Sequence, residues 1–176
     1  MSFGTGSPKV FPDVVAVGSL TKSELLASLS GHNIQLNQAA EDLFADPRFQ
    51  PSGQAVDIKI SARSVSSLGF KDGATYPQIV VRARELGMTE CPLELAPYLR
   101  LQFMNQAEAV ERVATKERQA PSGSLTVAAK PIAQADDVPK GFYLRRIDGA
   151  LWLRGYWADF IHVWSKDDVI VFALLA

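Results

Sequence analysis

The spacing of apolar positions predicts two helices near the start of the chain. Thr21 and Glu24 have the spacing of a capping box, and leucines follow at helical intervals until Gly31. A second run of apolar positions at helical spacing predicts a helix over residues 37–45. This helix must end before Pro47, because the residue that precedes a proline is disfavoured in helical geometry.

The period of the pattern then changes from helical to alternating. Residues 56–63 are apolar at every second position, which predicts a strand with one buried face. A further capping box at Thr75 and Gln78 opens a third helix, and Gly87 ends it.

The clearest local signal is a β-hairpin over residues 142–157. Its Asp148-Gly149 dipeptide is favoured in two-residue type I′ turns, because both central residues of such a turn need positive φ. A turn at this point places one set of side chains on the core face: Phe142, Leu144, Leu151 and Leu153. The opposite face, called here the hairpin outer face, carries Tyr143, Arg145, Trp152, Arg154 and Tyr156.

The remaining segments complete the predicted fold. We expect a short helical turn over residues 92–95, a strand over residues 99–103, a helix over residues 106–119 and a strand over residues 125–132. The last apolar run, residues 169–174, is apolar on both faces and is therefore expected to be a central strand.

Helices grouped early and strands grouped late predict an α+β domain. We expect a mainly antiparallel sheet of about five to six strands that ends in the hairpin, with the N-terminal and middle helices packed on it. The single domain spans residues 20–176, and residues 1–19, rich in Gly, Ser and Pro, are expected to form a flexible N-terminal segment.

Composition excludes several classes of function. With 18 basic and 19 acidic residues the formal charge is −1, so nucleic acid is not the expected ligand. One cysteine rules out an internal disulfide or a thiolate-rich metal site, and two histidines rule out a three-histidine centre. No apolar run is long enough to span a membrane as a helix. We expect a cytoplasmic protein without a metal or cofactor.

Two residues suggest catalysis, each with a simpler interpretation. Cys91 precedes a helical turn, which is one way to lower a thiol pKa, yet a lone cysteine is more often a buried apolar residue. His162 has nearby aspartates that suit acid–base chemistry, but aspartates also make turns. Glu90 and Glu94 form a weaker pair, because Pro92 lies between them.

The hairpin outer face is the stronger candidate for a binding site. The predicted register places Tyr143 opposite Arg154 and Arg145 opposite Trp152, so that guanidinium groups alternate with rings. Such faces bind proteins, anionic small molecules or single-stranded nucleic acid. Two other interpretations remain open: the pairs only stabilise a solvated face, or a helix covers them.

The stretch from Val56 to Gln106 includes the segment RARELGMTECPLELAPYLRLQF. Through this segment the chain resembles an uncharacterised family of small bacterial proteins, and the similarity continues loosely into GALWLRGYW and VIVF. The resemblance implies no activity, cofactor or catalytic residue. The chain also lacks the GxxxxGK[ST] loop that cradles nucleotide phosphates, so the sequence does not support a helicase or NTPase function.

Two hypotheses follow from the sequence. The first is a non-catalytic binding protein that uses the hairpin outer face to hold a protein or a small molecule. The second is a small hydrolase or transferase with its site near Cys91 or His162. The oligomeric state stays open in both.

Overall fold

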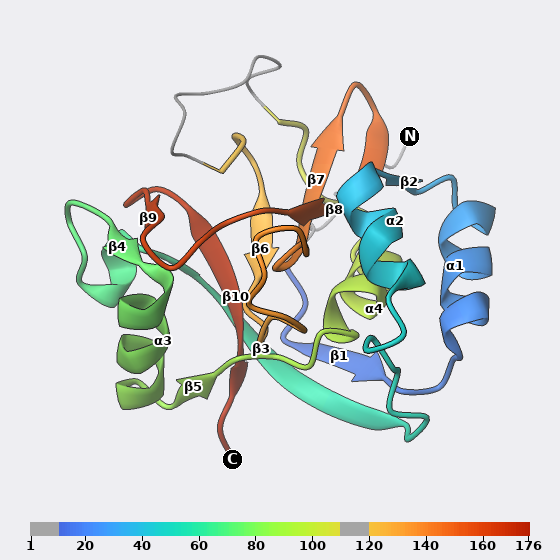
Figure 1. The fold of residues 1–176 in the computed structure, drawn as a ribbon, viewed down its shortest axis with the longest axis horizontal. Coiled ribbons are helices and arrows are strands. Elements are labelled where there is room, and N and C mark those ends of the chain that lie inside the picture. Colours follow the sequence, from blue (N-terminus) through green and yellow to red (C-terminus); the bar gives the residue numbers. More distant parts are fainter. Residues whose placement is uncertain (1–10, 110–119) are drawn as a thin grey trace, which may run out of the picture.

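The computed structural model describes residues 11–109 and 120–176, and within them it shows an α+β fold (Figure 1). The α-helices are α1 (Lys22–Gly31), α2 (Gln38–Ala45), α3 (Tyr76–Glu85) and α4 (Leu95–Gln102), with a 3-10 helix, η1, at Ser66–Leu68. The strands of the first half are β1 (Val14–Val17), β2 (Gln35–Leu36), β3 (Val56–Ser64), β4 (Ala74–Thr75) and β5 (Met88–Thr89). Those of the second half are β6 (Leu125–Val127), β7 (Gly141–Ile147), β8 (Ala150–Tyr156), β9 (Val163–Trp164) and β10 (Val169–Leu174).

The strands form one large mixed sheet and one small ribbon. In the large sheet the order is β1-β3-β10-β6-β7-β8-β2, with β5 added beside β10. The β10–β6 and β2–β8 pairs are parallel, and the other pairs of this sheet are antiparallel. The ribbon joins β4 to β9. The α+β class with a mainly antiparallel sheet is confirmed, but the sheet has more strands than predicted and includes parallel pairs.

The large sheet is buried on both faces at its centre, whereas β1 and β3 carry several exposed residues. The helices α1, α2 and α4 gather on one side of the molecule, and α3 lies with β4 and β9 on the other (Figure 1). Along β10, Val171 and Ala173 belong to the first core, whereas Ile170 and Phe172 belong to the second. The prediction that residues 169–174 form a central, doubly buried strand is therefore confirmed.

The hairpin has the predicted turn and register. Asp148 and Gly149 have φ values of 51° and 77°, as the type I′ turn requires. Tyr143 pairs with Arg154, and Arg145 pairs with Trp152. The predicted capping boxes also form: Thr21 N–H donates to Glu24 Oε2 at 2.8 Å, and Thr75 N–H donates to Gln78 Oε1 at 2.9 Å.

The predicted strand over residues 99–103 is wrong, because residues 95–102 form helix α4. Pro97 lies in the first turn of this helix, where a backbone N–H has no acceptor within the helix, so it does not break the helix. Residues 95–100 are all buried, so the helix has no polar face to reveal its period.

Three other segments differ from the expectation. Strand β6 covers only residues 125–127 of the strand expected over 125–132. Of the helix expected over 106–119, residues 106–109 are not helical, and 110–119 lie outside the described residues. Within the segment expected to be flexible, Val14–Val17 forms strand β1 and pairs with β3.

Candidate functional site

The hairpin outer face is only partly open to solvent. Tyr143 and Arg145 are buried, at 9% and 7% exposure. The Arg145 Nε–H donates to the carbonyl of Ser122 at 2.9 Å, because residues 120–124 lie against this part of the hairpin. Trp152 and Arg154 are half-buried. The face therefore cannot act as one continuous exposed surface, because Tyr143 and Arg145 interrupt it.

The accessible arginine of this face is held by aromatic side chains. The Arg154 guanidinium lies 4.9 Å from the centre of the Trp152 ring, which is cation–π geometry. Its Nε–H also donates to the Tyr143 hydroxyl at 2.8 Å. The first contact joins two residues of β8, and the second crosses to β7. Together they fix the arginine in place and agree with the stabilising interpretation of the pattern.

The last residue of the hairpin, Tyr156, leads into an aromatic cluster. Its ring meets Trp164 edge to face at 5.6 Å, and the His162 ring meets the same indole at 5.3 Å. Trp164 is held there by the ribbon, in which it pairs with Ala74 of β4. The cluster thus joins the end of β8 to the start of α3, where Tyr76 lies.

Two pockets meet at this cluster and share Tyr156, Ala158 and Trp164. The first is called here the acidic pocket. It is lined by Tyr76, Pro131, Gln134, Asp136, Lys140, Asp159, Phe160 and the three shared residues. The second, called here the hairpin pocket, is lined by Ala120, Pro121, Thr126, Tyr143, Gly155, Trp157, His162 and the shared residues. Together the two pockets form an aromatic cleft.

The two tyrosines of the acidic pocket remain neutral. Burial raises the pKa of Tyr76, and the nearby Tyr156 and Glu90 raise it further. Burial also raises the pKa of Tyr156, with a smaller effect from Glu90. The Tyr76 hydroxyl lies 3.0 Å from Glu90 Oε1 and 3.1 Å from the carbonyl of Ala129, so its proton is shared between two acceptors. These hydroxyls are hydrogen-bonding groups rather than bases.

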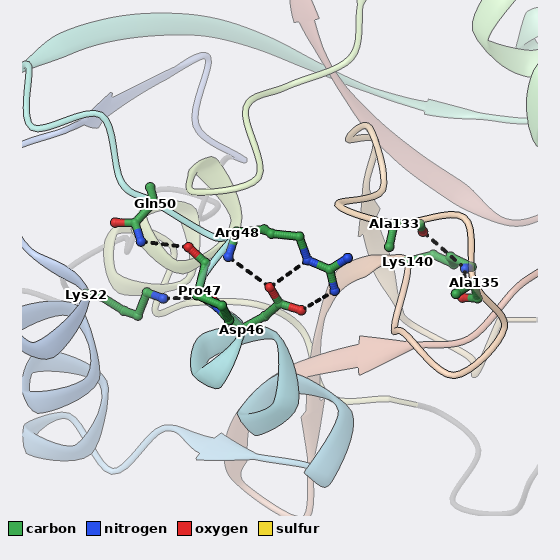
Figure 2. Close-up of polar contacts among 8 residues, drawn as sticks. All are labelled: Lys22, Asp46, Pro47, Arg48, Gln50, Ala133, Ala135 and Lys140. Atoms are coloured by element: carbon green, nitrogen blue, oxygen red, sulfur yellow. Dashed lines mark hydrogen bonds and ion pairs between the residues drawn. The ribbon is translucent and has the colours of Figure 1, made fainter.

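The lysine of the acidic pocket is occupied by backbone carbonyls. Lys140 Nζ donates to the carbonyls of Ala133 and Ala135 at 3.3 Å and 2.5 Å (Figure 2). These bonds hold together the 133–140 loop, which supplies Gln134, Asp136 and Lys140 to the pocket wall. The backbone N–H of Lys140 also donates to the Tyr156 carbonyl at 2.8 Å, which ties the loop to the end of β8.

Cys91 and His162 line different pockets. Cys91 is 4% exposed, packs in the first core and lies with its Sγ 3.8 Å from the Val171 carbonyl. Burial raises the pKa of its thiol to about 12. His162 lies in the hairpin pocket, which shares no residue with the pocket that contains Cys91. This arrangement does not support a thiol nucleophile with a histidine base.

The other acidic pair of the sequence is also separated. Glu90 contacts Tyr76 and lies 3.6 Å from Arg84, whereas Glu94 accepts hydrogen bonds from the backbone N–H of Ser52 at 3.1 and 3.2 Å. The two carboxylates therefore have different structural partners.

Sequence reasoning missed three residues that the structure makes prominent. Tyr76 follows the predicted helix start at Thr75, and Trp164 lies two residues after His162, but no spacing in the sequence marks either of them as part of a site. The Trp164 Nε1–H is buried and has no hydrogen-bond partner in the described part of the chain. Arg100, expected on a strand, is fully buried on α4 and donates to Gln106 Oε1 at 2.5 Å. Burial, with a smaller effect from Arg146, lowers its pKa to about 10.

Comparison with known proteins adds no assignment. No protein-family model, curated protein or solved structure matches the chain. Within residues 11–109 and 120–176, no group of three or more His, Cys, Asp or Glu side chains is placed to hold a metal ion. Over the same residues, no helix has both the length and the apolar character needed to cross a membrane.

Proposed function

We propose that this protein is a non-catalytic binding protein that takes a small organic molecule into the aromatic cleft. The observation that carries the proposal is the meeting of Tyr156 from the hairpin with Trp164 from the ribbon, with an open pocket on each side. Ligand sites in proteins are commonly concave and apolar, with a few polar groups that fix orientation. The cleft has this character.

The cleft also retains part of the face that the sequence favoured. Tyr143 and Tyr156 of the hairpin outer face line the hairpin pocket, and Tyr156 continues into the acidic pocket. The separate burial of Cys91 favours binding over thiol chemistry. A binding site needs walls that match its ligand, and it does not need a nucleophile paired with a base. The residues that line the cleft can therefore serve as a binding site.

The proposal is tested by screening small aromatic fragments against the full chain by two-dimensional NMR. The readout is the set of indole N–H signals, since the chain has three tryptophans. A fragment that enters the cleft shifts the Trp164 signal, which lies in the wall of both pockets, more than the Trp152 signal.

Two neighbouring variants make this test specific. Phe160 lines the acidic pocket and is 57% exposed, whereas Ile161 is 80% exposed and lines neither pocket of the cleft. Phe160→Ala should weaken a fragment that shifts Trp164 at least about fivefold, because a ring contact is lost. Ile161→Ala should leave its affinity unchanged. If no fragment shifts Trp164, or if both variants act alike, the proposal is refuted.

The half-buried Trp152 and Arg154 favour a second candidate, a protein partner on the open part of the hairpin. Arg145 is unsuitable for testing it, because replacing this buried, hydrogen-bonded side chain would disturb the fold. Trp152→Ala and Arg154→Glu should instead abolish partner capture without lowering stability by more than about 1 kcal/mol. Capture that persists in both variants would contradict this candidate.

A further inference from the structure

The walls of the acidic pocket are aromatic on several sides. Tyr76 comes from α3, Tyr156 from β8, Trp164 from β9 and Phe160 from the 157–162 segment. Aromatic rings present a negative π face, and several rings around one space attract a cation that has lost part of its water shell. The acidic pocket therefore offers the type of wall that suits an ammonium head group.

The charged groups around the pocket also favour a positively charged ligand. Asp136 and Asp159 line it, and Lys140 is the one cation among the lining residues. The Lys140 ammonium donates to two carbonyls of its own loop, so those bonds compete with any anionic ligand. Glu90 adds negative charge behind Tyr76, although Arg84 at 3.6 Å offsets part of it. The balance favours a cation.

Trp164 meets the pocket with its ring and not with its N–H. The residue is 4% exposed, and its Nε1 atom is shielded from solvent and has no acceptor among residues 11–109 and 120–176. A ligand in the pocket therefore contacts the aromatic ring of Trp164.

We infer that the acidic pocket binds a small organic amine, either an ammonium or a quaternary ammonium compound. This inference rests on the proposed function, since it names the ligand class of the same cleft. Asp136 and Asp159 attract the cation, and the rings of Tyr156 and Trp164 contact it.

The inference is tested with two probes of the same shape. Choline and 3,3-dimethyl-1-butanol share the branched head and the hydroxyl, but only choline is charged. Each is titrated into the full chain, and the Trp164 indole signal is followed by NMR. Choline should bind at least about tenfold more tightly than the alcohol, because the desolvated cation contacts several rings.

Charge-neutral variants add a matched control. Asp136→Asn combined with Asp159→Asn should lower the choline affinity at least about threefold and leave the affinity of the alcohol unchanged. Asn at 159 retains an oxygen for the Ile161 and His162 N–H groups, which lie 3.1 and 2.8 Å from Asp159 Oδ1. Asp137→Asn is the control, because Asp137 neighbours Asp136 but does not line the pocket.

The outcomes separate the two proposals. Equal binding of choline and the alcohol overturns the amine assignment and leaves the cleft as a binding site. If neutral or anionic fragments shift the Trp164 signal and choline does not, the amine assignment is also overturned and the cleft remains a binding site. If neither probe nor any fragment shifts Trp164, both the amine assignment and the proposed function fail.

Discussion

The reactivity of Cys91 provides a direct test of whether this residue is a nucleophile. Burial raises the pKa of its thiol from 9.0 to about 12, so at neutral pH the thiolate fraction falls about a thousandfold. Because the thiolate is the reacting species, a disulfide reagent should modify the folded protein at least about a thousandfold more slowly than the unfolded chain. The sulfur is also shielded, since Cys91 is 4% exposed.

The measurement is the rate of reaction with 5,5′-dithiobis(2-nitrobenzoate) at pH 7.5, in buffer and in denaturing urea. Cys91→Ala is the blank, because the chain has one cysteine and this variant should give no signal. A folded-state rate within tenfold of the unfolded rate would refute the reasoning. It would mean that the sulfur is open and ionised, and it would restore the thiol form of the enzyme hypothesis.

Three further substitutions test the packing and the electrostatics of the fold. Gly155→Ala should lower stability by about 1–3 kcal/mol in urea unfolding, because its Cβ would lie 2.6 Å from the Ala39 carbonyl carbon. Gly31→Ala, where a Cβ meets nothing within 4 Å, should instead raise stability by up to about 1 kcal/mol, and equal effects at the two sites would contradict the packing argument. Burial raises the pKa of Asp168 from 3.8 to about 6, so its folded form favours the proton and stability should fall as pH rises from 4 through 6. Asp168→Asn should remove up to about 3 kcal/mol of this fall in stability. In urea unfolding, the difference in stability between the variant and the wild type should therefore change as the pH rises. A difference that stays constant with pH would show that the pKa of Asp168 is not raised.

The hairpin was predictable because its determinants are local. The turn depends on Asp148 and Gly149, and that turn alone sets every cross-strand pair of β7 and β8. Helix α4 was not predictable in the same way, because it is buried around its circumference and even includes the buried Arg100. A helix without a polar face loses the period by which helices are recognised, and Leu99, Leu101 and Phe103 then imitate a strand.

The candidate site was predicted only where it depends on the hairpin. Tyr143 and Tyr156 followed from the register, but the burial of Arg145 comes from the Ser122 segment, 23 residues earlier in the chain. Trp164 reaches the cleft through the two-residue pairing of β4 and β9, which is too short to leave a pattern in the sequence. The parallel pairing of β2 with β8 is equally short.

The shape of the cleft depends on the absence of a side chain at Gly141. This glycine pairs with Tyr156, and an added Cβ would lie 3.1 Å from both Cε1 and the hydroxyl oxygen of that tyrosine. The Tyr156 ring therefore lies across the neighbouring backbone, and from there it meets the edge-to-face partner Trp164. The contacts with this backbone and with Trp164 thus help to set the position of the ring. A cross-strand glycine–tyrosine pair, which usually serves to shield a weak point of a sheet, here also positions a wall shared by both pockets.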